Sequence, residues 1–229
     1  MRRIGLLGGM SWESSVEYER VINQEVRRRL GGVHSADMVI RSFDFADVEQ
    51  QQSAGDWDAA ADLLHRGACD LVAAGAEVLA LCTNTMHKVA DAVAGIAGTT
   101  FVHIADPTAA AAHANGAQRV GLLGTRYTME EPFLADRLRE RGIDVVIPEP
   151  DDLEIVHRVI YDELVRGVIN ESSRRAYQEV MARLVQRGAQ AVVAGCTEIE
   201  LLVGADDAVV PLLPTAKLHA LAIVDAALG

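Results

Sequence analysis

An internal repeat constrains this chain more than any other feature of its sequence. The segment IGLLG at Ile4–Gly8 recurs as VGLLG at Val120–Gly124, 116 residues later. The segment Leu71–Ala76 recurs as Leu184–Ala189 with an offset of 113 residues. A Pro-Thr-Ala triplet that begins at Pro107 returns 107 residues later. Three matches in the same order predict a duplicated unit with small insertions and deletions.

Apolar runs that alternate with amphipathic segments predict an α/β fold with parallel sheets. Helices are expected from Ser11 to about Leu30, over Trp57–Ala74 and from about Met86. We therefore expect two pseudosymmetric lobes, each a parallel-sheet α/β sandwich, with a cleft between them as the active site. Within one unit, 1–229, lobe one would span about 1–98 plus 212–229, and lobe two about 99–211. The expected strands are Arg3–Leu7, Met38–Ser42, Val78–Cys82, Phe101–Ala105, Val120–Leu123, Val145–Ile147, Ala191–Ala194 and Val209–Leu213.

Composition excludes several classes of protein. The net charge of −12 argues against a nucleic-acid partner, because the only basic run, Arg27–Arg29, is followed by glycines as at a helix C-terminus. No run approaches the ~20 apolar residues of a membrane span, and nothing resembles a signal peptide. The chain has three cysteines and no CxxC pair, and its histidines show no metal-ligand spacing. We expect a cytoplasmic protein with free thiols, no metal and no membrane partner.

Open parallel sheets bind ligands beyond the carboxyl ends of their strands. Four polar segments follow expected strands in matched pairs: Gly8–Trp12 with Thr125–Thr128, and Thr83–Thr85 with Cys196–Glu198. The glycine turn is neither a GxGxxG nor a Walker A sequence, so it gives nucleotide binding little support. A helix start there would suit a carboxylate, although the glycines could serve only the geometry of the turn.

Two segments that each contain a cysteine lie at equivalent places in the repeat, at the ends of apolar strands. The first half contains LCTNTMH at Leu81–His87, and the second contains AGCTEI at Ala194–Ile199. A helix N-terminus lowers the pKa of a thiol, so a reactive thiolate is expected here. The alternative for a single cysteine is a small buried apolar residue. The occurrence of such segments in both halves favours the reactive thiol.

These segments resemble the aspartate/glutamate racemase family along nearly the whole chain. The segments GLLGGMSWES, TNTMHK, HIADPT and GCTEIE are similar to the aspartate racemase branch. The resemblance implies a cofactor-independent isomerase that racemises an amino acid, with aspartate or glutamate as the expected substrate. It also implies that two side chains flank the substrate Cα and exchange its proton on opposite faces.

The chain departs from the family in its first lobe, where Thr83-Asn84-Thr85 replaces the usual Cys-Asn-Thr. Thr83 lies eight residues after Gly75, as Cys196 does after Gly188, so the repeat makes Thr83 the mate of Cys196. Cys82 lies one residue earlier, where a strand turns its side chain to the other face. We expect Cys196 as the thiol base and Thr83 on the opposite face, with Cys82 as the alternative. Since a hydroxyl hardly ionises, Thr83 would relay a proton from water, His87 or Glu198. Proton transfer would then be slower on the Thr83 face, and the initial rates from the two enantiomers would differ.

The resemblance also implies how a small anionic amino acid would be held. Asn84, Thr85 and Thr197 would bind the α-carboxylate, and Gln52 lies in a segment similar to a substrate loop, although its Gln run could equally be an exposed helix start. Arg126 and Arg166 are candidates for the side-chain carboxylate. Glu163 could approach the cleft, although we expect it to face solvent. A homodimer is compatible with the sequence. The expected substrate-binding residues are Met10, Ser11, Gln52, Asn84, Thr85, Thr125, Thr128, Thr197 and Glu198.

Two alternatives stay open at this point. A dicarboxylate isomerase or decarboxylase of the same superfamily would use a strand-end cysteine as a covalent nucleophile, and a stable adduct on Cys196 would identify it. A non-catalytic protein that binds a small acid is the second alternative, because Thr83 replaces a catalytic thiol. Such a protein would bind its ligand without solvent exchange at Cα.

Overall fold

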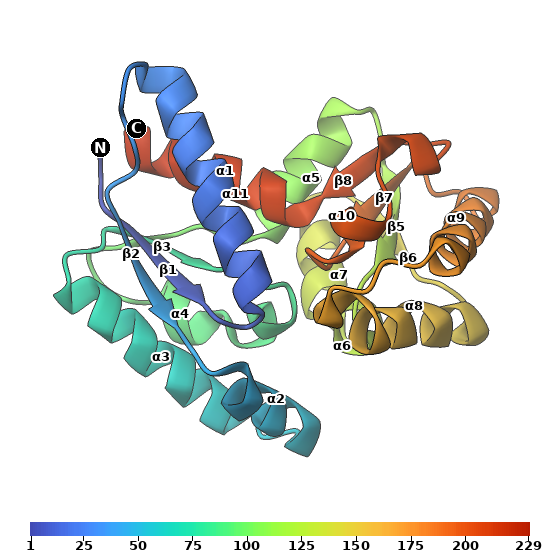
Figure 1. Cartoon of the computed structure of the whole chain (residues 1–229), viewed down its shortest axis with the longest axis horizontal. Coiled ribbons are helices and arrows are strands. Elements are labelled where there is room, and N and C mark those ends of the chain that lie inside the picture. The colour runs from blue at the N-terminus through green and yellow to red at the C-terminus, as the bar shows by residue number, and fades with distance from the viewer. The chain divides into compact units, whose positions relative to one another are not determined.

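A computed structural model describes all residues, Met1–Gly229, and divides them into two compact units (Figure 1). Unit 1 comprises Met1–His103 and His219–Gly229, and unit 2 comprises Ile104–Leu218. Each unit contains one four-stranded sheet in which every pairing is parallel. The predicted α/β class with two parallel sheets is therefore confirmed.

The sheet of unit 1 has the strand order β2-β1-β3-β4. In its register, Ile4 lies opposite both Met38 and Val78. Figure 1 shows α1 and α11 on one face of this sheet, and α3 with α4 on the other. The elements are β1 (Ile4–Gly8), α1 (Trp12–Leu30), β2 (Met38–Ser42), α2 (Phe45–Ala54), α3 (Trp57–Ala73), β3 (Val78–Leu81), the 3-10 helix η1 (Thr85–Val89), α4 (Asp91–Ala94), β4 (Thr100–Phe101) and the part of α11 (Thr215–Leu228) from His219 onward.

The sheet of unit 2 repeats this topology with the order β6-β5-β7-β8. Val120 lies opposite both Val145 and Ala191 in its register. The elements are α5 (Ala105–Ala114), β5 (Arg119–Leu123), α6 (Arg126–Glu130), α7 (Pro132–Glu140), β6 (Asp144–Val146), α8 (Pro150–Asp162), η2 (Leu164–Arg166), α9 (Glu171–Gln186), β7 (Ala191–Ala194), α10 (Ile199–Leu202), η3 (Ala205–Asp207) and β8 (Leu212–Pro214).

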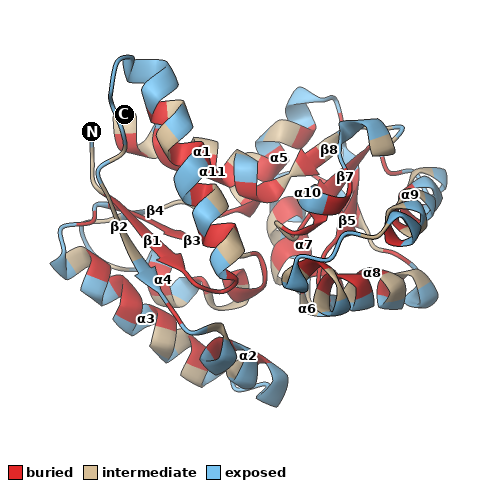
Figure 2. Ribbon diagram, in the orientation of Figure 1, coloured by how far each residue is buried: buried red, intermediate tan, exposed pale blue.

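The central strands are buried on both faces, as Figure 2 shows in red. In unit 2 the alternation of side chains along β5 separates two apolar layers. Leu122 packs with the residues of α5 and α7, whereas Leu123 packs with those of α8 and α9. Full burial of one such side chain contributes ~1.5–3 kcal/mol. The continuous apolar runs of the sequence arise because helices cover both faces.

A glycine in the middle of each first strand explains one part of the repeat. A Cβ at Gly5 would lie 2.7 Å from the Ala76 Cβ, and one at Gly121 would lie 2.9 Å from the Leu184 Cδ1. Ala76 follows α3 and Leu184 lies in α9, which are equivalent helices of the two halves. The glycines therefore let one helix pack directly onto each sheet.

Several boundaries differ from the sequence-based predictions. The predicted strand Phe101–Ala105 is only Thr100–Phe101, because Ala105 already begins α5. The predicted strand Val209–Leu213 is Leu212–Pro214, and the preceding Pro211 contributes only its carbonyl oxygen, which accepts from the Val192 N–H at 2.9 Å. The predicted α-helix from Met86 begins as the 3-10 helix η1. Helix α2 was expected only as one interpretation of the Gln run; Asp44 caps its start and the left-handed Gly55 ends it. None of the helices combines the length and the apolar character that crossing a membrane would require.

Candidate functional site

The loop after β1 is a tight and strained turn. Gly9 has a φ of 80°, and a Cβ there would lie 2.2 Å from the Phe43 carbonyl oxygen, so only glycine fits. The Gly9 N–H donates to the Ser15 Oγ at 2.8 Å. Ser11 has a φ of 114° and is the one non-glycine residue with positive φ, a strain that costs about 1–3 kcal/mol. Met10 was expected to bind substrate, but its side chain is buried in the apolar cluster of unit 1.

The segment after β3 places its polar residues on a short turn. Thr83 is half-buried, while Asn84 and Thr85 are buried. The His87 N–H donates to the Asn84 carbonyl oxygen at 3.0 Å, and the His87 Nδ1 lies 2.7 Å from the Thr83 carbonyl oxygen. These two bonds fold Thr83–His87 into a compact turn at the carboxyl end of β3.

Cys82, the alternative to Thr83, directly follows β3. Its side chain has no exposed surface. Burial raises the pKa of the Cys82 thiol far above its usual range. In the structure Cys82 is a small apolar core residue.

Gln52 connects α2 to the turn after β3. Its Nε2 donates to the Met86 Sδ at 3.0 Å, and its side chain is buried. The Gln run does lie in a helix, α2, as the alternative interpretation expected, but Gln52 is buried rather than exposed. The structure brings Gln52 to the carboxyl end of the first sheet, together with Thr83–Thr85.

In unit 2, the loop after β5 is closed by two threonines. The Thr125 Oγ1 caps α6 by accepting from the Thr128 N–H at 3.3 Å, and the two hydroxyl oxygens lie 3.2 Å apart. Both side chains are buried. A Cβ at Gly195 would lie 3.3 Å from the Thr128 Cγ2, so this loop lies beside the one that carries Cys196.

Cys196 lies two residues after the end of β7 and forms a short polar contact. Its S–H donates to the Glu198 Oε2, with an S-to-O distance of 2.9 Å. Cys196 and Thr197 are half-buried, and Glu198 is buried. A thiol and a carboxylate therefore share one proton at the carboxyl end of the second sheet.

The electrostatics of Cys196 correct one prediction. A helix N-terminus was expected to lower the pKa of this thiol, but α10 has only four residues. Burial instead raises the pKa of Cys196 well above its ordinary value, and the negative charges of Glu198 and Glu200 raise it further. Without substrate, Cys196 is a protonated thiol next to an acceptor.

A buried polar layer that the sequence analysis missed lies behind Cys196. The Tyr177 hydroxyl donates to the Val156 carbonyl oxygen at 2.9 Å. Burial raises the pKa of Tyr177, with further contributions from Cys196 and Glu163, so all three groups are close. Glu163 is half-buried and accepts from the Ser173 Oγ at 2.6 Å, rather than pointing simply into solvent. The spacing of apolar residues in α9 marks Tyr177 only as a core residue, so no sequence signal identified it.

The two arginines that were candidates for the side-chain carboxylate, Arg126 and Arg166, lie on the surface of unit 2. Arg126 is exposed and forms an ion pair with Glu154, and Arg166 is also exposed.

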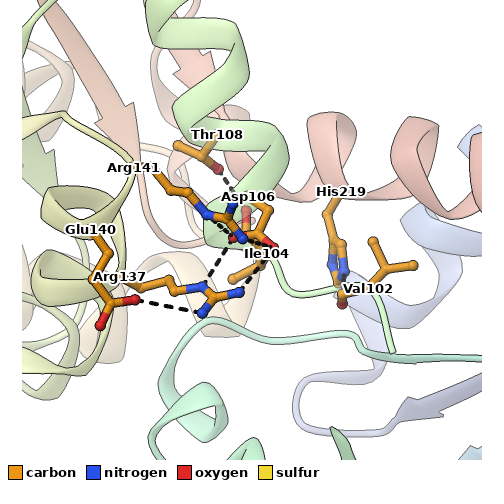
Figure 3. A network of polar contacts seen from close by, with 8 residues as sticks. All are labelled: Val102, Ile104, Asp106, Thr108, Arg137, Glu140, Arg141 and His219. Atoms are coloured by element: carbon orange, nitrogen blue, oxygen red, sulfur yellow. Dashed lines mark hydrogen bonds and ion pairs between the residues drawn. The ribbon is translucent and has the colours of Figure 1, made fainter. Parts of the chain in front are cut away.

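Asp106, from the HIADPT segment, accepts from Arg137 at 3.0 and 3.1 Å and from Arg141 at 3.1 Å (Figure 3). Asp106 lies in the first turn of α5, where a negative charge suits the helix dipole. Because Arg137 lies in α7, its bonds to Asp106 anchor α5 to α7. The structure holds no group of three or more His, Cys, Asp or Glu side chains that could bind a metal.

One family model and three solved structures agree with this architecture. The model of the Asp/Glu/hydantoin racemase family matches residues 7–223. A candidate Asp/Glu racemase of Yersinia pestis is 50% identical over the whole of both chains, with a TM-score of 0.94. An aspartate racemase homologue of Pyrococcus horikoshii OT3 is 29% identical over the whole of both chains, with a TM-score of 0.87. The aspartate racemase of Picrophilus torridus shares the fold at 19% identity, with 99% and 94% of the two chains covered and a TM-score of 0.77.

Proposed function

Because the chain belongs to the Asp/Glu/hydantoin racemase family, and is thus an isomerase of the amino-acid racemase type, we propose that it interconverts the enantiomers of aspartate or glutamate without a cofactor. The observation that carries the proposal is the Cys196–Glu198 pair, with its S-to-O distance of 2.9 Å at the carboxyl end of β7. The reaction removes a proton from the substrate Cα on one face and returns a proton on the other.

Cys196 is the proposed base on the first face. Its S–H already donates to the Glu198 carboxylate, so the thiol proton has an acceptor when the thiolate forms. The burial and the negative charges that make this thiolate scarce also make it more basic, because a higher pKa means a stronger attraction for a proton. A strong base suits the abstraction of a weakly acidic Cα proton.

Thr83 is the proposed group on the opposite face. It occupies the position equivalent to Cys196 in the repeat, and it is half-buried whereas Cys82 is fully buried. A hydroxyl hardly ionises near neutral pH, so Thr83 passes on a proton that another group supplies. The two faces therefore work at unequal speeds, although the equilibrium between free enantiomers stays at one to one.

The substrate carboxylates need hydrogen-bond donors at the strand ends. In the proposal, Asn84, Thr85 and Thr197 bind the α-carboxylate, and Gln52 borders the substrate. The Thr125 hydroxyl already caps α6, and Met10 is buried, so their loops contribute backbone N–H groups.

Proton NMR of four substrates in D₂O tests this proposal. L- and D-aspartate and L- and D-glutamate are each incubated with the enzyme, and the loss of the Cα–H signal is followed while chiral chromatography detects the opposite enantiomer. Cys196→Ala is expected to lose this reaction. Cys69→Ala, at an exposed free thiol, is the matched control and should retain it.

The outcomes separate the alternatives. Cα exchange that depends on Cys196 and yields the opposite enantiomer establishes racemisation. A stable covalent adduct on Cys196 indicates a related isomerase or decarboxylase instead. An equal rate in Cys196→Ala and wild type refutes the assignment of the base.

A further inference from the structure

Three histidines and a tyrosine pack together in unit 1, beneath the turn that carries Thr83. The ring centroid of His87 lies 4.6 Å from that of His103 and 5.8 Å from that of His219. The Tyr18 hydroxyl lies 2.8 Å from the His219 Nδ1. His87, His219 and Tyr18 are buried, whereas His103 is half-buried. We call these four residues the imidazole cluster.

The hydrogen bonds of the cluster determine where its protons lie. A carbonyl oxygen only accepts, so the His219 Nε2, 2.7 Å from the Val102 oxygen, carries the hydrogen (Figure 3). The His219 Nδ1 then accepts from the Tyr18 hydroxyl. By the same reasoning, His87 donates from Nδ1 to the Thr83 carbonyl oxygen at 2.7 Å. The nitrogen of neutral His87 that can accept a proton is therefore Nε2.

The proposed function leaves the Thr83 face without a source of protons. A threonine hydroxyl that gives its proton to Cα must be reprotonated in the same step, because a free alkoxide is far too basic. Cys82 cannot supply this proton, since it is fully buried and burial raises the pKa of its thiol. His87 is a titratable group, and its Nδ1 is hydrogen-bonded to the Thr83 carbonyl oxygen.

We propose that the imidazole cluster supplies and removes the proton on the Thr83 face, with His87 as the positioning residue that acts through the Thr83 hydroxyl and His103 as the link to solvent. This inference rests on the proposed racemase function. In the forward step, the Thr83 O–H bond breaks as its proton joins Cα, and a proton from the His87 imidazolium moves to the Thr83 oxygen, directly or through one water. His87 returns to the neutral form and is recharged through His103. The reverse step carries a Cα proton along the same path.

The surroundings of His87 keep such a proton transient. The pKa of His87 is lowered well below its usual value, first by burial and then by the charges of His103 and His219. His103 and His219 are the titratable groups that act electrostatically on His87, and Tyr18 reaches the cluster through its hydrogen bond to His219. The cluster can hold one proton briefly but not two, because two charged imidazoles 4.6 Å apart would repel each other. Such a group can pass protons on without storing them.

A rate measurement that separates the two faces tests the proposal. In D₂O, the enantiomer whose Cα–H faces Cys196 loses its proton with or without inversion, whereas inversion requires the Thr83 face. His87→Asn retains a side-chain N–H that can donate to the Thr83 carbonyl oxygen but has no basic nitrogen. We expect this variant to exchange the Cα proton of one enantiomer within about threefold of wild type, while inversion falls about tenfold or more. The pH profile of inversion should lose its imidazole-dependent limb.

A second pair of variants keeps the test decisive if His87→Asn does not fold. His103→Asn, at a half-buried position, should lower inversion and spare exchange. Tyr18→Phe removes a bond of the cluster that does not involve Thr83 and should leave the ratio of exchange to inversion unchanged. Wild-type ratios in both histidine variants would overturn the proposal. A wild-type enzyme that neither exchanges nor inverts any of the four substrates would instead refute the proposed function, and this inference with it.

Discussion

The charge of Glu198 is the clearest target for a quantitative test of the site. Glu198→Gln replaces a carboxylate that lies 2.9 Å from the Cys196 Sγ with a neutral group of the same shape. A thiolate and a carboxylate at this separation repel each other by ~1.4 kcal/mol even at the dielectric constant of water, and by more in a buried site. Because ~1.4 kcal/mol is a factor of ten, the thiolate fraction of Cys196 near pH 7.5 should rise about tenfold or more in the variant.

Alkylation by iodoacetamide measures this change, because the reagent reacts with the thiolate. The modification of the Cys196 peptide is followed by mass spectrometry between pH 6.5 and 10, with exposed Cys69 as the internal reference. Because the pKa of Cys196 is raised well above its ordinary value, its alkylation rate still rises with pH at pH 10, so the variant and wild type are compared at every pH. Glu200→Gln is the matched control, since Glu200 also raises the pKa of Cys196 but contributes less than Glu198. An alkylation profile of Glu198→Gln that coincides with wild type would show that Glu198 does not control this thiol.

Three further predictions concern the opposite face, the strained loop and the response to acid. Thr83→Cys should raise kcat in the slower direction about tenfold or more, while kcat/KM stays equal in the two directions. Chiral chromatography of initial rates measures both quantities. An unchanged kcat would contradict the assignment of Thr83. In urea unfolding, Ser11→Gly should be about 1 kcal/mol more stable than Ser11→Ala. Both variants lose the side chain that caps α1, but only alanine retains the backbone strain at a φ of 114°. Equal stabilities of the two variants would refute this. The free energy of unfolding should fall as the pH drops below ~6.5, by up to ~1.4 kcal/mol per pH unit for one group. The pKa of His87 is lowered in the folded protein, so as the pH falls His87 binds a proton in the unfolded chain before it does so in the folded one. His87→Asn should show a flatter dependence, and a slope equal to that of wild type would contradict this origin.

The sequence alone determined the repeat, the parallel α/β class and the strand ends that carry polar residues. These features follow from local patterns: apolar runs mark strands covered on both faces, and matched offsets align Thr83 with Cys196. The glycines at Gly5 and Gly121 belong to the same pattern, because each faces a helix of its own half.

Only the tertiary structure decided the electrostatics and the partners of these residues. The helix that follows Cys196, α10, has only four residues, so its dipole does not lower the pKa of the thiol as expected. That pKa is raised instead by burial and by Glu198. The contacts between His87 and His219, 132 positions apart, and between Tyr18 and His219 join distant segments, so no local pattern predicts them. Local sequence sets which element a residue joins, whereas pKa values and proton paths depend on which side chains the folded chain brings within a few ångströms.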